Sequence, residues 1–182
     1  MRYGPFILLV SLVAGVSGQQ ATDPMRDVFL RRVDDYVALH GQLEAPLPRQ
    51  VVTDDLEALF APRKTLSAAI RSARADARQG DIFSPALASY FRTLVGDALR
   101  QGGITDMLAI VEDENLTHIP PSVNGDYPAG RSIAPMPTCL IAALPPLPPE
   151  LQYRFVGRDL ILWDIHAGLI VDFLPDAIRE TT

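Results

Sequence analysis

The sequence has little cysteine, little lysine and no excess of positive charge. One cysteine among 182 residues excludes a disulfide framework and a cysteine-rich zinc module. Sixteen basic and 22 acidic residues give a formal net charge of −6, which argues against a general nucleic-acid binder. The chain also lacks a Gly-x-Ser-x-Gly motif, a phosphate-binding loop, a dinucleotide fingerprint and a His-Glu-x-x-His motif. No familiar catalytic signature is therefore present.

The composition is that of a folded protein. Hydrophobic residues make up 48% and charged residues 21% of the chain, which excludes a disordered tail. The length suits one domain with a sizeable core. We expect a single globular domain over residues 19–182.

Residues 1–18 read as a secretory signal peptide. Arg2 is the only charge before an apolar run over residues 5–16, and small residues follow at Ser17 and Gly18. The run is well short of the roughly 20 residues that span a bilayer. We expect cleavage near Gly18 and a periplasmic or secreted protein; retention of the segment as an amphiphilic anchor is the alternative.

Residues 23–115 have the periodicity of helices. Asp23 and Pro24 are a favourable cap and first turn, and apolar residues then recur every three or four positions until Gly41 and Pro46. Further helices are expected over residues 53–61, 63–78, 84–101 and 105–111, with a break at Pro62. The pattern predicts four or five helices.

The remainder of the chain follows two other patterns. Residues 116–150 hold nine prolines and predict an ordered loop with one or two helical turns over 138–144. Residues 151–175 alternate apolar and polar side chains in three runs separated by glycines, which predicts a three-stranded antiparallel β-meander. Three strands are too few to stand alone, so the sheet should lie on the helices or on the loop. The fold class is α+β, helices first.

One candidate binding surface is basic. Arg71, Arg74 and Arg78 fall on one side of the helix expected over 63–78, within a region whose balance is +4, whereas residues 103–182 carry −7. Such a face would suit an anionic polymer or an envelope protein. The competing interpretations are a solvated helix face and attraction between two halves of one domain.

One candidate metal site lies near the C-terminus. Asp164-Ile165-His166 resembles the Asp-x-His that opens metallophosphoesterase sites, and Asp172 could face the same pocket across the hairpin. The further motifs of those enzymes are absent, and the spacing of His40 and His118 suggests no ligand role. The alternative is a turn in which Asp164 accepts backbone hydrogen bonds and His166 packs beside Trp163.

Two further features of the sequence are weaker candidates for a functional site. Cys139 lies in an apolar segment without a nearby base and is expected to be buried and inert. Three consecutive acids at residues 112–114, with Asp106 nearby, could attract a calcium ion, but they lack the glycine and ligand spacing of calcium loops.

The segments 144–178 (LPPLPPELQYRFVGRDLILWDIHAGLIVDFLPDAI) and 79–85 (QGDIFSP) resemble those of uncharacterised exported bacterial proteins. The resemblance implies export and no assigned activity. We expect a non-catalytic binding or accessory protein of the bacterial cell envelope, without cofactor, nucleic-acid partner or membrane span after signal removal. The alternative is a small metal-dependent hydrolase using Asp164, His166 and Asp172.

Overall fold

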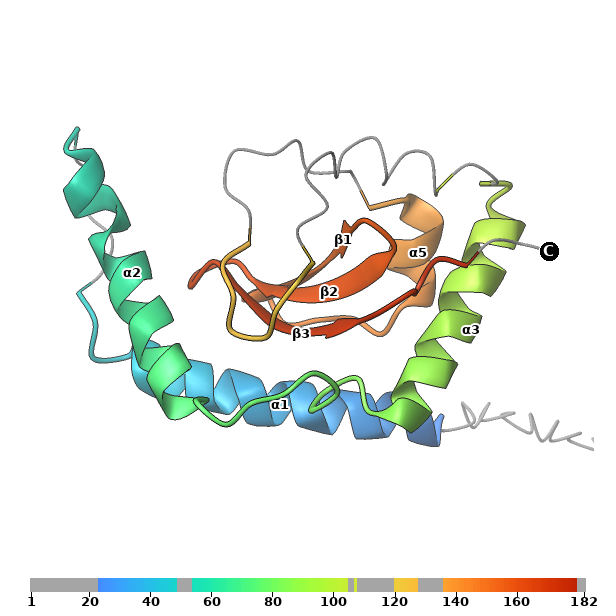
Figure 1. The fold of residues 1–182 in the computed structure, drawn as a ribbon, viewed down its shortest axis with the longest axis horizontal. Helices are drawn as coiled ribbons and strands as arrows, with labels where there is room; N and C mark the ends of the chain where they lie inside the picture. The colour runs from blue at the N-terminus through green and yellow to red at the C-terminus, as the bar shows by residue number, and fades with distance from the viewer. Residues whose placement is uncertain (1–22, 49–53, 105–106, 108–119, 128–135, 180–182) are drawn as a thin grey trace, which may run out of the picture.

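The computed structural model of the protein describes residues 23–48, 54–104, 107, 120–127 and 136–179. Within these residues, four helices precede a three-stranded sheet, which confirms the expected α+β class (Figure 1). The elements are α1 (Pro24–Glu44), α2 (Leu56–Ala73), α3 (Pro85–Gln101), α5 (Thr138–Ala143), β1 (Leu151–Val156), β2 (Asp159–Asp164) and β3 (Leu169–Leu174).

Helix α1 begins and faces the core as the sequence predicts. The Asp23 carboxylate accepts hydrogen bonds from the amides of Met25 (3.0 Å) and Arg26, and Pro24 occupies the first turn, where no amide hydrogen is needed. The buried residues Phe29, Val33, Tyr36 and His40 recur at three- and four-residue spacing and form its inner face.

The break predicted at Pro62 is wrong, because α2 continues through this residue. Asp55 caps the helix by accepting a bond from the Glu57 amide (2.9 Å). Pro62 removes one intrahelical hydrogen bond, while Leu66 and Ile70 beyond it are buried in the core and hold the downstream turns in place. The helix ends at Ala73, five residues earlier than expected.

Strands β1, β2 and β3 form the predicted antiparallel meander, in that spatial order. Gly157 and Gly168 have positive φ angles of 57° and 72° at the two turns, a conformation that glycine adopts without steric cost. Another tight turn lies at residues 122–125, where Asn124 has a φ of 60° and the Gly125 amide donates to the Ser122 carbonyl.

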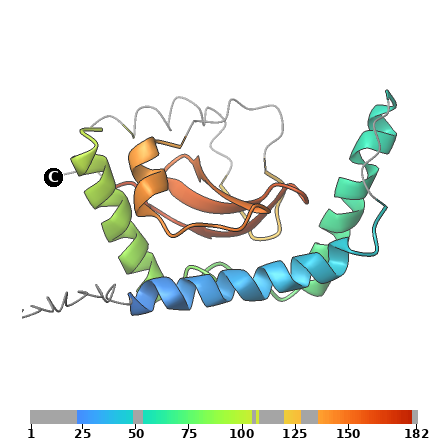
Figure 2. The ribbon, with the colours of Figure 1, turned by 180° about the vertical axis from the view of Figure 1, so that it is seen from behind.

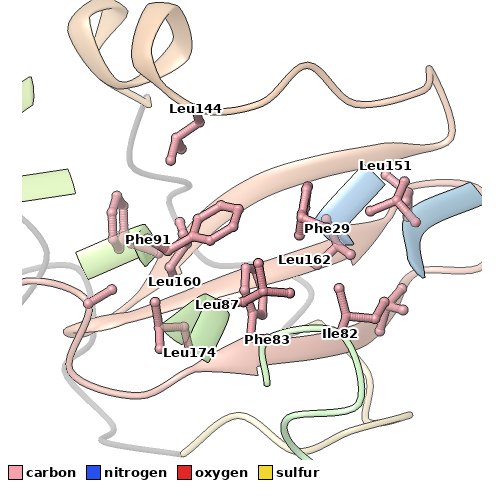
Figure 3. Packing of buried hydrophobic residues seen from close by; sticks show 14 of the residues in the cluster. Phe29, Ile82, Phe83, Leu87, Phe91, Leu144, Leu151, Leu160, Leu162 and Leu174 are labelled. Carbon is pink, nitrogen blue, oxygen red and sulfur yellow. The ribbon is translucent and has the colours of Figure 1, made fainter. Parts of the chain in front are cut away.

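The helices frame the sheet. Helix α1 runs along one face of it, with α2 and α3 rising at opposite ends, and α5 packs between the sheet and α3 (Figures 1 and 2). The shared core combines aromatic rings from α1, α3 and the 80–83 loop with leucines of the sheet (Figure 3). Phe29, Phe83 and Phe91 lie at its centre, with centroids 4.7–5.8 Å apart.

Several predicted features fall outside the described residues. These are the signal peptide at 1–18, His118, the acidic run at 112–114, and the helix over 105–111 apart from the buried Met107. Within the described part of the chain, no helix is long and apolar enough to cross a bilayer. Cys139 is half-buried, and its sulfur lies against Gly102 at the end of α3.

Candidate metal centre

The last two turns of α1 present three polar side chains in a row. Tyr36, His40 and Glu44 are spaced by four residues, so they lie above one another on a single helix face. This face meets the β2–β3 turn, residues 165–168, at the end of the molecule where α2 stands (Figure 1). Residues more than 120 positions apart in the chain therefore meet here.

Asp164, at the end of β2, anchors the arrangement. Its carboxylate is completely buried and accepts hydrogen bonds from the Tyr36 hydroxyl (2.6 Å), the His40 ring Nδ1 (2.6 Å) and the Ala167 amide (2.8 Å). Burial raises the pKa of Asp164, but these hydrogen bonds outweigh burial and hold the pKa below its usual value. The buried carboxylate is therefore ionised.

The ionised carboxylate sets the protonation of its neighbours. Burial and the charge of Asp164 raise the pKa of Tyr36 far above its ordinary value, so the phenol keeps its proton and donates it. Because Asp164 can only accept, His40 carries a proton on Nδ1. Burial lowers the pKa of His40, but the hydrogen bonds and charges of Asp164 and Glu44 outweigh burial and raise it. A lone pair on Nε2, which a metal ion needs, is present only in the neutral imidazole, where it points away from Asp164.

Nε2 of His40 faces the carboxylate of Glu44, which also contacts His166. It lies 3.1 Å from one carboxylate oxygen of Glu44, whose other oxygen lies 2.8 Å from Nδ1 of His166. One ligand atom from each of these residues can be chosen so that all lie within 4.8 Å of one another. We call His40, Glu44 and His166 the donor cluster.

The donor cluster fits a divalent transition metal. Two imidazoles and a carboxylate are typical zinc ligands, and metal–ligand bonds of about 2.0–2.1 Å place tetrahedral donors about 3.3 Å apart. The observed 3.1 Å and 2.8 Å separations run to different oxygens of Glu44, and a set with one atom from each residue lies within 4.8 Å, so the three side chains would have to close around an ion. A ligating histidine normally donates its other ring N–H to a carboxylate, and His40 already does so to Asp164.

A groove opens beside the donor cluster. It has a volume of about 650 Å³ and lies between the end of α1, the first half of α2 and the β2–β3 turn. Glu44, His166 and Arg63 are its charged and ionisable lining residues, and apolar side chains complete its walls. His166 and Glu44 are each a little over 40% exposed, so an ion held here is accessible from solvent.

Of the three metal ligands expected from the sequence, only His166 joins the donor cluster. Asp164 bonds to Nδ1 of His40 and accepts the Ala167 amide, as the alternative interpretation of this turn expects for its carboxylate. His166, expected there beside Trp163, lies beside Glu44 and His40. Asp172 accepts hydrogen bonds from the backbone amides of Gly80, Ile82 and Phe83. Its carboxylate therefore holds the loop before α3.

Two of the three candidate arginines contact the chain itself. Arg71 donates to the Asn124 carbonyl (2.9 Å) and to Asp126 (2.6 Å), and Arg74 donates to the Asn124 side chain and the Val171 carbonyl. These bonds attach the end of α2 to the 120–127 segment and to β3. Arg78 is exposed and lies beyond the end of α2, so the three do not share one helix face.

Sequence reasoning missed Tyr36, His40 and Glu44 as site residues. His40 and Glu44 form a His-x-x-x-Glu pair on a helix, which places both side chains on one face and is a common ligand spacing. This signal is present in the sequence, but His40 also continues the apolar stripe of α1, which equally indicates a core position. Its distance of 124 residues from Asp164 concealed the pairing.

Comparisons with protein-family models, with curated proteins and with solved structures find no match. The functional argument therefore rests on the geometry of the donor cluster and the groove beside it.

Proposed function

We propose that the protein is a metal-binding protein that holds one divalent transition-metal ion, most suitably zinc, between His40, Glu44 and His166. The observation that carries the proposal is the convergence of three donor atoms within 4.8 Å, one of them on an imidazole already oriented by a buried carboxylate. Clusters of exposed acidic side chains rarely include a ligand that a buried carboxylate holds in place by a hydrogen bond. Here Asp164, Tyr36 and the Ala167 amide fix the His40 ring.

The donor types favour zinc over calcium or magnesium. Calcium takes six to eight oxygen ligands and magnesium an octahedral oxygen shell, whereas this cluster offers two nitrogens and one carboxylate. Three protein ligands also leave a coordination position open, as in catalytic rather than structural zinc sites.

The test is zinc binding by the purified full chain and by variants with altered ligands. We expect one equivalent of zinc, measured by competition with a chromophoric chelator. His166→Ala and Glu44→Gln should each weaken binding at least about 100-fold, since even loss of an outer partner costs 10–100-fold. Both side chains are partly exposed, so these variants should fold.

Asp35→Asn is the matched control. Asp35 lies exposed on the same helix, outside the donor cluster, so its loss removes one negative charge without removing a ligand. Zinc affinity should then stay near that of the wild type. Wild-type protein that binds no zinc, or ligand variants that bind as well as Asp35→Asn, would refute the proposal.

Metal-dependent hydrolysis is a second candidate, favoured by the groove beside the donor cluster. A metal ion with an open position supplies Lewis-acid catalysis of ester and phosphate hydrolysis. Zinc-loaded wild type should then cleave a chromogenic carboxylic or phosphate ester faster than His166→Ala. Equal rates would leave binding as the function.

An exported binding or accessory role in the cell envelope remains compatible with a metal-binding site. The support is the sequence of residues 1–18, which has the charge, length and small residues of a signal peptide. An envelope protein or an anionic polymer stays a proposed partner. Fractionation of the native host and crosslinking with tagged protein would test both: a cytosolic, uncrosslinked protein contradicts them.

A further inference from the structure

An arginine from α2 faces the same groove as the donor cluster. Arg63 lines the groove together with Glu44 and His166, and its guanidinium lies directly against the backbone of Gly168. Gly168 closes the β2–β3 turn, two residues after His166. A positive charge is thus placed beside the proposed metal position without belonging to the ligand set.

The absence of a side chain at Gly168 makes this placement possible. A Cβ atom built there would lie 2.1 Å from Nη2, 2.3 Å from Nε and 2.5 Å from Cζ of Arg63, closer than atoms can approach. Gly168 also has a φ of 72°, which disfavours other residues. Glycine at position 168 therefore allows both the backbone conformation of the turn and the close approach of the Arg63 guanidinium.

The guanidinium of Arg63 has unused hydrogen-bonding capacity. Arg71, Arg74 and Arg92 each donate to backbone carbonyls elsewhere in the fold. Among the described residues, no acceptor is bonded to Arg63, although a guanidinium offers five donors in a planar fork that matches an oxyanion. Its side chain is exposed toward the groove.

We propose that Arg63 binds the oxyanion of a ligand, a carboxylate or a phosphate, that enters the groove next to the metal. This inference deepens the proposed metal-binding function and rests on it for the second contact of the ligand. Leu59, Phe60 and Ile165 are among the apolar lining residues, and Phe60 is 45% exposed. The ligand is therefore an amphiphilic anion whose apolar part lies along these side chains.

The test compares three probes with the same apolar chain: octanoate, octyl phosphate and the uncharged octanamide. Binding to the full chain is measured by calorimetry with and without zinc. We expect at least one anion to bind at least about tenfold more tightly than octanamide, since a charge-assisted hydrogen bond contributes about 1.5–3 kcal/mol. Comparing the affinities for octanoate and octyl phosphate then shows whether the groove prefers a carboxylate or a phosphate.

Arg63→Gln should abolish the preference for the anion and leave the zinc stoichiometry unchanged, because Arg63 is not a ligand. Lys64→Gln is the matched control: it removes a positive charge at the next position, where the lysine pairs with Glu57 instead. It should keep the preference.

The outcomes separate the two proposals. Normal zinc binding with no preference for either anion, or with a preference that survives Arg63→Gln, overturns the role of Arg63 alone. Absence of zinc binding overturns the metal site. In that case, anion preference measured without zinc, and its loss in Arg63→Gln, would still support the anion-binding residue.

Discussion

Replacing the buried carboxylate of Asp172 tests how the loop before α3 is held. Asp172 is completely buried on β3, 89–92 residues away from the amides that it accepts. The Ile82 (2.7 Å) and Phe83 (2.8 Å) amides share one oxygen, while the Gly80 amide (3.0 Å) donates to the other. Asp172→Ala removes both acceptor oxygens, and with them the hydrogen bonds from these three amides, and leaves a small void.

The expected loss of stability follows from these contacts. A buried donor left without a partner costs about 1–3 kcal/mol, and the Ile82 and Phe83 amides are both buried. The Gly80 amide is only half-buried, so water can replace its acceptor. Asp172→Ala should therefore destabilise the fold by about 4 kcal/mol, a large part of the 5–15 kcal/mol typical of a domain. Asp172→Asn keeps one acceptor oxygen and should cost about half as much.

Urea unfolding followed by circular dichroism measures the difference in free energy. Asp126→Ala is the control, because it removes an exposed carboxylate whose ion pair with Arg71 is worth at most about 1 kcal/mol. A loss below about 1 kcal/mol for Asp172→Ala would refute the structural role of its hydrogen bonds. It would also reopen Asp172 as a functional carboxylate.

Three further predictions follow from the site and the first helix. Zinc at 100 times its dissociation constant should stabilise the native state by about 2.7 kcal/mol, and an unchanged thermal midpoint on zinc addition would contradict binding to the fold. Tyr36→Phe should destabilise the protein by about 1–3 kcal/mol, measured by urea unfolding, and weaken zinc binding about 10–100-fold, measured by chelator competition. Zinc binding at the wild-type level would show that Asp164 orients His40 without the phenol. Asp23→Ala should cost about 0.5–2 kcal/mol as the cap is lost. The hydrogen bond from Tyr90 lowers the pKa of Asp23 in the folded state. The difference in unfolding free energy between wild type and Asp23→Ala should therefore be complete above the ordinary pKa of about 3.9 and shrink as the pH falls below it. A difference that stays constant down to pH 2 would contradict the role of the ionised cap.

Local chemistry predicted most of the fold. The cap at Asp23, the glycine turns and the alternation in the last 30 residues each reflect short-range rules, and the structure follows them. The exception was α2, where a local rule for Pro62 predicted two helices. Buried contacts of Leu66 and Ile70 beyond the proline outweigh one missing hydrogen bond.

The site was only half visible in the sequence, for a related reason. The pair Asp164 and His166 could be singled out because both belong to one short motif. Their partners on α1, Tyr36 and His40, also fit the helical pattern as ordinary core residues. The sequence around a buried histidine does not show whether its ring bonds to a distant carboxylate or only packs against apolar side chains. The same holds for Arg63, whose role depends on a glycine 105 positions later.

The separation of the site residues along the chain has a consequence for when the site forms. Tyr36, His40 and Glu44 belong to the first helix, whereas their contacts on β2 and the following turn lie 122–128 residues later. A nascent chain that ends before residue 164 contains two of the three donor residues and lacks Asp164, the carboxylate that orients His40. Loop closure on this scale precedes any stable contact between the halves, so assembly of the site is a late event in folding. If the donor cluster holds a metal ion as proposed, loading follows completion of the fold, and the ions available in the compartment where the fold is completed determine which metal the protein carries.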